Sequence, residues 1–485
     1  WYESLQQLDW NADRTLQGQV YEQFSRAILA GDLRPGDRLP STRELAKVLG
    51  IGRNTASWVF EQLAMEGFVR TRQGSGTYVA DELPDFGDLD RLKTKAARPE
   101  ALASTLAQRS ERYAVVARSL RVPQRPVPFR INMPAVDDFP ISLWRRVTKS
   151  LMADGAGYLL GETEPAGYGP LREAITRYLI INRGVVCTAD QVIIVAGAQQ
   201  GLDLATRLLL DIGDQVLCED PGFPGSVAAL RAAGARIGAV PVGSDGFDIA
   251  LGAGAHPDAR LAVVCPSSQF PLGNTMSLAN RLALIEWAKQ KNGWIIEDDY
   301  DSEFHFYNKP FAAIQGLFEN APVLYMGSFS KTLLPALRVG YLVVPEAVVE
   351  PLLWAKQISG GETPLLTQAT IAEFIESGQF TRHLRRMRQL YRDKWRLFQR
   401  EVTEKLGGLA QPVAESAGMH LVLEGDFDDL ALSQWLKARG FGSTPLSAHF
   451  LGDSSRTGLV MGFASANERE IRECVNTLQS GLTKP

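Results

Sequence analysis

The stretch GSFSKTLLPALRVGYLV, residues 327–343, decides the fold class of the larger part of the chain. It places Lys331 between a Ser-Phe-Ser turn and an apolar run that contains Arg338 and Gly340. Lys331 is the only amine side chain in the stretch, so it either extends its stem toward water or takes part in chemistry. The rest of the sequence has to distinguish these two interpretations.

Length and composition indicate a globular protein with more than one domain. The chain has 485 residues, of which 45% are hydrophobic and 22% charged, and its formal net charge is -4. A chain of this length usually forms two or more domains. The negative balance argues against nonspecific binding of polyanions, so any contact with nucleic acid must be local.

Cysteine usage and hydropathy narrow the class further. The four cysteines are scattered without CxxC spacing, which disfavours a disulfide framework and a zinc site, and we expect no metal. No apolar run reaches the roughly 18 residues that a membrane span needs. The amino end shows no signal-peptide pattern, so we expect a cytoplasmic protein without a membrane partner.

Residues 128–485 alternate β-rich apolar runs with helical patterns. This rhythm predicts an α/β domain with a mostly parallel sheet covered by helices. Ligands of such sheets bind at the carboxyl ends of the strands. The predicted strands are 191–196, 215–219, 260–265, 293–298, 322–328 and 339–344.

Three predicted strand ends carry polar groups that one cofactor would use. Asp298 and Tyr300 follow one strand, Lys331 follows the next, and a third strand runs through 197–199 directly into a helix. A helix start of this kind presents free N–H groups to an anion. Pyridoxal 5′-phosphate combines an aldehyde for a lysine amine, a phosphate for a helix start and a ring nitrogen for a carboxylate.

Each of these residues therefore receives an expected role toward pyridoxal phosphate. We expect Lys331 to form a Schiff base with the aldehyde, Asp298 to keep the ring nitrogen protonated, and Tyr300 to hydrogen-bond the ring oxygen. Taken singly, a surface lysine, a turn aspartate and a plain helix start are ordinary structural features. The residues expected around the phosphate are Ala198, Gln199, Ser328, Ser330 and Arg338.

Residues 1–80 form a separate module of three predicted helices and a hairpin. Ser41 and Glu44 have the spacing of a capping box at the start of the second helix, and the third begins near Arg53. The sequence FVRTRQGSGTYV, 68–79, predicts two strands around a Gly-Ser-Gly turn. This order favours a winged helix-turn-helix that binds DNA, although a three-helix bundle with a hairpin also fits.

The module from LQGQVYEQF to GSGTYV closely resembles the DNA-binding domain of GntR-type bacterial regulators. The resemblance implies that the second helix of the motif enters the major groove of double-stranded DNA, while the wing touches the minor groove or backbone. The DNA contacts that it implies are Arg43, Arg53, Asn54, Thr55, Arg72, Gly74, Ser75 and Gly76.

Residues 128–485 resemble the fold-type I aminotransferases over essentially their full length, including EPAGYGPLREAITRYLIINRGV. Joined through a Pro-rich, mixed-charge linker at 81–127, the two domains resemble the MocR/GabR family of transcriptional regulators. The resemblance implies a homodimer whose aminotransferase-like domain binds pyridoxal phosphate and senses a small amine, an amino acid or the cofactor itself.

Further roles follow from the same resemblance. Phe223 is implied to stack on the cofactor ring, and Arg456, just before the LVMGFA strand, to receive an effector carboxylate. Phe270 stands where aminotransferases usually carry an Asn that contacts the ring oxygen. Gly225 stands where the γ-aminobutyrate-sensing member has a ligand-binding Arg, which argues against γ-aminobutyrate as the effector.

Three functions remain open on the sequence. The first is a pyridoxal-phosphate-dependent regulator that binds operator DNA and is not an enzyme, beyond a residual half-transamination. The second is an active aminotransferase with an accessory winged helix. The third is a repressor whose large domain serves only as a dimerisation scaffold, and the intact set Lys331, Asp298, Tyr300 and Arg338 argues against it.

Overall fold

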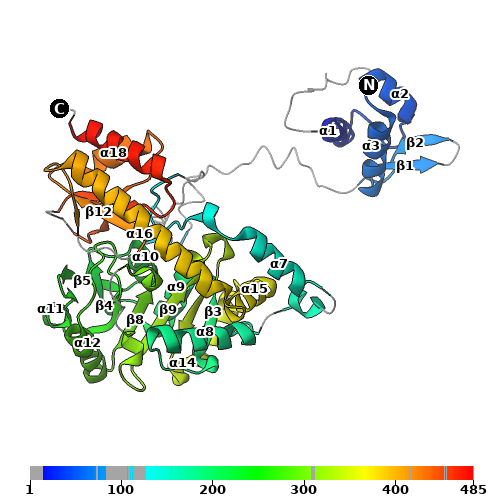
Figure 1. The fold of residues 1–485 in the computed structure, drawn as a ribbon. Coiled ribbons are helices and arrows are strands. Elements are labelled where there is room, and N and C mark those ends of the chain that lie inside the picture. Colours follow the sequence, from blue (N-terminus) through cyan, green and yellow to red (C-terminus); the bar gives the residue numbers. More distant parts are fainter. Residues whose placement is uncertain are drawn as a thin grey trace. The chain divides into compact units, whose positions relative to one another are not determined.

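The computed structural model divides into two compact units, Trp1–Leu106 and Ala107–Pro485, called here the small and the large unit. Both are drawn in Figure 1. The predicted linker 81–127 lies almost entirely outside the described residues. The described residues are 15–72, 75–83, 106–107, 110, 112–113, 127–153, 156–162, 164–306, 312–413, 418–452, 454 and 456–483.

The small unit contains three helices followed by an antiparallel hairpin, as the sequence predicts. The helices are α1 (Leu16–Leu29), α2 (Thr42–Leu49) and α3 (Arg53–Met65), and the hairpin strands are β1 (Val69–Arg72) and β2 (Gly76–Val79). The predicted capping box of Ser41 and Glu44 is present at the start of α2. Gly50 ends that helix in the left-handed conformation that glycine adopts without strain.

One apolar core holds the small unit together. Phe24 of α1 and Phe60 of α3 meet edge to face with ring centroids 5.7 Å apart. Val59 and Leu63 are fully buried beside them, and Val79 joins the hairpin to the same cluster. The buried residues of α3 lie on one side of the helix, which leaves its first turn free for other contacts.

The large unit is built on an eight-stranded sheet with the order β3-β10-β9-β8-β7-β4-β5-β6. Neighbours are parallel from β9 through β8, β7 and β4 to β5, whereas β10 and β6 run antiparallel to the strands that they pair with. The mostly parallel sheet is therefore confirmed. Its strands are β3 (Val192–Val195), β4 (Gln215–Asp220), β5 (Arg236–Gly243), β6 (Gly246–Phe247), β7 (Ala259–Val264), β8 (Trp294–Asp299), β9 (Val323–Ser328) and β10 (Gly340–Val343).

Helices cover both faces of this sheet, which explains its continuous apolar strands. Ile193 and Val195 of β3 pack in a cluster with α9 and α14, whereas Val192 and Ile194 point to the other face and pack with α8. The helices of the large unit are α7 (Ile141–Leu151), α8 (Gly169–Arg183), α9 (Ala198–Leu209), α10 (Pro224–Ala233), α11 (Ile249–Ala255), α12 (Leu278–Lys291), α13 (Phe329–Thr332), α14 (Glu346–Ser359), α15 (Leu365–Glu376), α16 (Gln379–Leu406), α17 (Asp429–Lys437) and α18 (Glu468–Leu482).

A second, four-stranded antiparallel sheet occupies the carboxyl-terminal part of the large unit, with the order β11-β12-β14-β13. The long helix α16 runs from beside α15 to this sheet, where α18 packs against it (Figure 1). No helix in the described ranges is both long and apolar enough to cross a bilayer. The strands are β11 (Gln411–Val413), β12 (His420–Glu424), β13 (Thr444–Pro445) and β14 (Gly458–Gly462).

Candidate cofactor site and DNA-binding face

A cavity of about 170 Å³ opens in the large unit where β8 and β9 end and α9 begins. All nine residues that the sequence predicts around the cofactor line it, so the fold brings together side chains from distant parts of the chain. Three further residues that were given no cofactor-binding role complete the wall. The lining residues are Asn132, Gly197, Ala198, Gln199, Phe223, Phe270, Asp298, Tyr300, Ser328, Ser330, Lys331 and Arg338.

Lys331 reaches into this cavity from the short helix α13. Its Nζ donates a hydrogen bond to the backbone oxygen of Asn132 at 3.3 Å. Burial lowers the pKa of Lys331 to about 8, while the nearby charges of Asp298 and Asp301 act in the opposite direction. A lysine with this pKa is about one-tenth neutral at pH 7, far more than an ordinary lysine, and the neutral amine is the form that condenses with an aldehyde.

Asp298 is the penultimate residue of β8, and its carboxylate lies on the cavity wall. It is only 4% exposed, and no hydrogen bond joins its side chain to any residue that the structure describes. Burial, and after it the charge of Asp299, raise the pKa of Asp298 to about 7, while Lys331 acts in the opposite direction. A cationic ring nitrogen would supply the partner that this carboxylate lacks.

Aromatic side chains form one wall of the cavity. Phe270 lies between Phe223 and Tyr300, with ring centroids 5.5 Å and 6.2 Å away. The Tyr300 hydroxyl is buried without a hydrogen-bond partner among the described residues, and burial raises the pKa of Tyr300 well above its usual value. Tyr300 is therefore a neutral donor, suited to an oxygen on a ligand ring.

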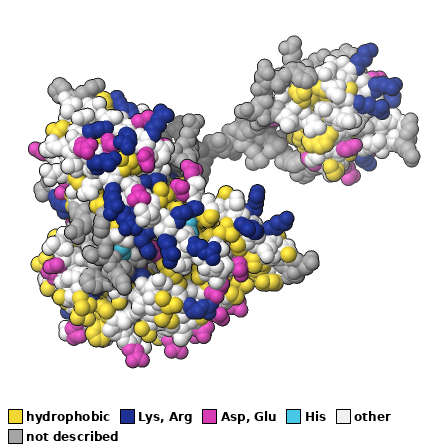
Figure 2. All heavy atoms as spheres, viewed as in Figure 1, with side chains coloured by type: hydrophobic (Ala, Val, Ile, Leu, Met, Phe, Trp, Pro, Cys, Tyr) yellow, Lys and Arg dark blue, Asp and Glu magenta, His cyan; other side chains and the backbone are white. Residues whose placement is uncertain are grey.

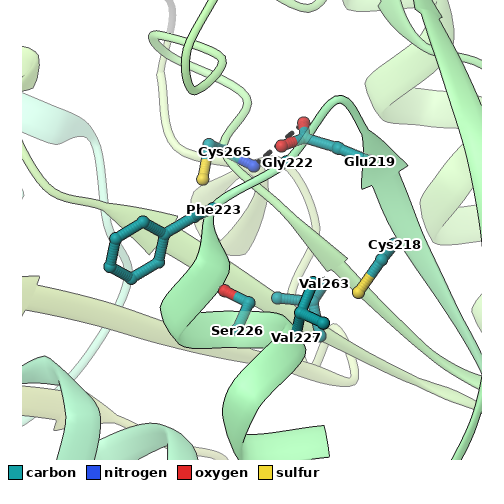
Figure 3. Close-up of a pocket in the computed structure, with 8 residues that line it drawn as sticks. All are labelled: Cys218, Glu219, Gly222, Phe223, Ser226, Val227, Val263 and Cys265. Atoms are coloured by element: carbon teal, nitrogen blue, oxygen red, sulfur yellow. Dashed lines mark hydrogen bonds between the residues drawn. The ribbon is translucent and has the colours of Figure 1, made fainter. Parts of the chain in front are cut away.

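A second, much smaller cavity lies behind Phe223 (Figure 3). Its volume of about 10 Å³ is close to that of one water molecule. Glu219, which lines it, accepts a hydrogen bond from the backbone N–H of Cys265 at 3.1 Å, and Ser226 Oγ has no partner in the described structure. The ring of Phe223 points away from Cys218 in the figure, and the residue lines both cavities.

The remaining corner of the large cavity suits a phosphate. Gly197 precedes α9 with φ 89° and provides no side-chain cap, so the first N–H groups of that helix are left for a ligand. Arg338, itself at φ 51°, donates from Nη2 to the backbone oxygen of Ala196 at 3.0 Å. Ser328 and Ser330 add hydroxyl groups beside them. A helix start, two hydroxyls and a guanidinium together match a phosphate dianion.

Arg456, the predicted effector residue, lies elsewhere. It is absent from the residues that line the cavity, and its Nε donates to Glu424 Oε1 at 2.6 Å. Glu424 ends β12, whereas His420, at the start of that strand, contacts the cavity wall through Phe270 with ring centroids 5.2 Å apart. The effector role of Arg456 stays a prediction, but this geometry does not favour it.

Asn132 is the lining residue that sequence reasoning missed entirely. Its φ is 63°, a left-handed conformation that asparagine tolerates better than most residues. It belongs to no strand or helix, so neither periodicity nor a capping pattern marks it. Phe270 was noted only as a departure from aminotransferases, and the fold shows it as the central ring of the aromatic wall.

In the small unit, the predicted DNA contacts on helices are accessible. Arg43 of α2 and both Arg53 and Asn54 in the first turn of α3 are exposed, and Thr55 is half-buried. Figure 2 shows Lys and Arg side chains gathered over α2. Such an exposed cationic helix pair matches the way helix-turn-helix proteins hold the phosphates of a major groove.

The hairpin supplies the rest of the predicted contacts. Arg72 lies over the ring of Tyr78, 5.1 Å from its centroid, and Ser75 and Tyr78 share a hydrogen bond of 2.8 Å between their hydroxyls. Gly76 has φ 119°, while Gly74 lies outside the described residues. Arg70 forms an ion pair with Asp81 at 2.8 Å, which leaves Arg72 as the freer cation of the two.

The fold and the two sites define a class of protein in which a winged-helix DNA-binding domain is fused to an aminotransferase-like domain. Residues 16–79 match the family described as bacterial regulatory proteins, gntR family, and residues 144–478 match aminotransferase class I and II. Aminotransferases of this class depend on pyridoxal phosphate.

Relatives with both parts extend over nearly the whole chain. The probable rhizopine catabolism regulatory protein MocR of Rhizobium meliloti is 37% identical, covering 98% of this chain and 95% of its own. The pyridoxine biosynthesis transcriptional regulator PdxR of Corynebacterium glutamicum is 29% identical, covering 94% and 93%. The chain therefore belongs to the MocR-type family of GntR-type transcriptional regulators with an aminotransferase-like domain.

Among solved structures, the large unit is similar to LysN, an α-aminoadipate aminotransferase from Thermus thermophilus that was solved with N-(5′-phosphopyridoxyl)-L-leucine. The two are 25% identical with a TM-score of 0.71, over 79% of this chain and 98% of that one. A kynurenine aminotransferase from Pyrococcus horikoshii, 21% identical with a TM-score of 0.69 over 82% and 98%, shares the fold.

Proposed function

We propose that this regulator binds pyridoxal phosphate covalently at Lys331, and that the loaded cavity senses a small amine, an amino acid or the cofactor itself. The state of the cavity then sets the affinity of the winged helix for operator DNA. The observation that supports this most directly is the cavity itself, in which an amine, a carboxylate and a helix start occur together.

Unpaired polar groups in the cavity fit the cofactor. Within the described ranges, Asp298 has no hydrogen-bond partner, the Tyr300 hydroxyl is buried without one, and the start of α9 lacks a side-chain cap. Buried polar groups are normally paired, so three such groups around one cavity indicate a ligand with matching atoms. When bound, pyridoxal phosphate supplies a carbon at which one amine replaces another.

The residues of the chain divide this task among themselves. Lys331 provides the amine that a free ligand amine can displace, while Asp298 would pair with the ring nitrogen and Tyr300 would hydrogen-bond the ring oxygen. Phe223 would cover one face of the ring, and the corner with Ser328, Ser330 and Arg338 would anchor the phosphate throughout. An effector thus changes the protein without release of the cofactor.

The effect on DNA binding depends on how differently the ligand binds the two states of the protein. Couplings of this kind usually amount to about 1–3 kcal/mol, or roughly 5- to 150-fold in affinity. We expect a homodimer, in which two winged helices contact paired half-sites of the operator.

The test combines absorbance with gel shifts on the full-length protein. Pyridoxal phosphate should give the wild type a new absorbance band, and borohydride reduction should fix the label on Lys331 and nowhere else. Lys331→Ala should lose both signals, whereas Lys394→Ala, which removes another buried lysine that donates to the backbone oxygen of Ala464, should retain them.

DNA affinity is the deciding measurement. We expect cofactor, or cofactor with one member of an amine panel, to change the gel-shift midpoint for the wild type but not for Lys331→Ala. Operator binding that is identical under all these conditions refutes the sensor role. Rapid turnover with a keto-acid acceptor would instead identify an active aminotransferase.

A further inference from the structure

The segment 128–135, which precedes α7 in the chain, contributes to the cavity wall and is bonded to the carboxyl-terminal sheet. The N–H of Gly442 donates to the Pro128 oxygen at 2.7 Å, and the N–H of Gly462 donates to the Phe129 oxygen at 2.9 Å. Phe129 forms an isolated bridge with Gly462, which adds the segment to the end of β14. The segment is thereby attached to the carboxyl-terminal sheet.

Two residues of this segment are held in a left-handed conformation. Phe129 has φ 66° and Asn132 has φ 63°. A bulky residue rarely adopts such a conformation, which is strained and persists only where its surroundings enforce it. Phe129 is fully buried, with its ring 5.2 Å from that of Phe398. Strained backbone of this kind often marks the place where a side chain must be aimed.

Arg130 is the charged residue between these two positions. Arg130 itself is not among the residues that line the cavity, but the segment reaches it two residues later, where Asn132 lines the wall and accepts the hydrogen bond of Lys331. The positive charge of Arg130 contributes to lowering the pKa of Lys331, after the larger effect of burial. Arg130 therefore lies close enough to the amine for the two charges to repel each other.

Arg130 has no counter-ion in the described part of the chain. It is half-buried, and no ion pair or hydrogen bond joins its guanidinium to a described residue. An unpaired, partly buried cation is costly, and an anionic ligand would relieve that cost. Arg456, by contrast, is paired with Glu424.

The pairing of β14 with β12 in the carboxyl-terminal sheet shows that Arg130 and Arg456 lie near opposite ends of β14. Gly462, which bridges to Phe129, pairs with His420, whereas Gly458 pairs with Glu424. Four residues of strand span about 13 Å. Arg130 is therefore next to the end of the sheet that faces the cavity, and Arg456 is at the opposite end.

We infer that Arg130 is the carboxylate receptor of the effector site, and that the effector is an amino acid whose amine reaches Lys331 while its carboxylate binds this guanidinium. The inference rests on the proposed function, because an amine can be sensed at Lys331 only when the cofactor is attached there.

Close backbone contacts fix the position of Arg130 without using its side chain. A Cβ on Gly462 would lie 2.2 Å from the Arg130 oxygen, and one on Gly442 would lie 2.8 Å from the Arg130 nitrogen. Only glycine at these two positions allows the segment to pack so closely. Substitutions of the Arg130 side chain should accordingly leave the segment in place.

The experiment uses full-length protein loaded with pyridoxal phosphate and two matched ligand pairs, L-alanine with L-alaninamide and β-alanine with β-alaninamide. The absorbance change gives an apparent Kd for each ligand. We expect the wild type to bind at least one amino acid about tenfold more tightly than its amide, the size typical of one charge-assisted hydrogen bond. In Arg130→Gln and Arg130→Met this preference should fall to near one, with Arg130→Lys keeping part of it.

Arg456→Gln is the matched control and should keep the wild-type preference. A second readout needs no effector: the pKa of the Lys331 linkage, followed by absorbance against pH, should rise in Arg130→Gln because a nearby cation has been removed. Propionate should compete with the amino acid in the wild type, and propionamide should not.

The outcomes separate the inference from the proposal beneath it. An unchanged amino acid preference in both Arg130→Gln and Arg130→Met overturns the assignment of Arg130, whatever the linkage pKa does. Loss of the preference in Arg456→Gln alone overturns it as well. A wild type that takes up no cofactor refutes the proposed function instead, whatever the role of the arginine.

Discussion

Asp298→Asn tests the electrostatics of the cavity with the smallest possible change in shape. The carboxylate is 4% exposed and has no hydrogen-bond partner among the described residues, so a bound ring nitrogen would receive all of its interaction. A hydrogen bond to a charged group contributes about 1.5–3 kcal/mol. At 1.4 kcal/mol for each tenfold, the variant should bind pyridoxal phosphate about 10- to 150-fold more weakly.

The same substitution should leave the covalent linkage possible. Asp298 is the stronger of the two charges that raise the pKa of Lys331, so its loss lowers that pKa further below its value of about 8. The share of neutral amine then increases, and borohydride should still label Lys331 at saturating cofactor. Affinity and linkage therefore respond differently to one change.

Asp301→Asn is the matched control. Asp301 is 1% exposed and its charge also acts on Lys331, yet it does not line the cavity. Titration of both variants by absorbance, with equilibrium dialysis as a check, should show a change below about threefold for Asp301→Asn, since no direct hydrogen bond is lost. Two results would refute the assignment of Asp298 to the ring nitrogen. One is an affinity for pyridoxal phosphate in Asp298→Asn equal to that of the wild type, and the other is a greater loss of that affinity in Asp301→Asn than in Asp298→Asn.

Three further perturbations address other parts of the molecule. In Gly225→Ala the new Cβ would lie 2.3 Å from Phe223 Cε1, so the Phe223 ring must move. Isothermal titration should then show pyridoxal phosphate binding about 2- to 10-fold more weakly, which corresponds to one aromatic contact. Unchanged affinity would contradict the stacking role of Phe223. Arg53→Ala should weaken operator binding and reduce the slope of log affinity against log salt by about 1, whereas Arg26→Ala, which removes an exposed partner of Glu22, should not. Burial raises the pKa of Glu219 from 4.5 to about 8, so the protonated carboxyl stabilises the fold below pH 4.5 and this stabilisation is lost as the pH rises to 8. Denaturant unfolding should show the stability of Glu219→Gln rising on the order of 1–3 kcal/mol relative to that of the wild type between pH 5 and 8. A difference in stability that does not vary with pH would exclude this titration.

The sequence predicts those parts of the fold that depend on local chemistry. The capping box at Ser41 and the glycine at position 50 fix the bounds of α2, because a side-chain cap and a left-handed residue are local requirements. The strands of the large sheet are buried on both faces, so their apolar runs are visible in the sequence. In the carboxyl-terminal sheet only β14 is anticipated, as the apolar LVMGFA run, whereas β11, β12 and β13 are two to five residues long, too short for periodicity to reveal.

The cavity, too, contains residues that the local sequence predicts and residues that it does not. Residues at strand ends, such as Asp298 and Lys331, can be predicted because parallel strands place their carboxyl ends at one edge of a sheet. Asn132 reaches the cavity, with Arg130 two residues before it, only because glycines 442 and 462 admit a distant backbone segment, and no local pattern encodes such a contact. Arg456 precedes a strand as expected, but the sequence does not tell which end of that strand faces the cavity.

The attachment of residues 128–135 has a mechanical consequence. This stretch both touches Lys331 through Asn132 and is bonded to Gly442 and Gly462. A ligand that displaces Lys331 from Asn132 removes one restraint while the others hold. The wall of the cavity beside Lys331 is therefore held by the carboxyl-terminal sheet as well as by the strands of the large sheet, so a change at the amine also reaches the attachment of that second sheet.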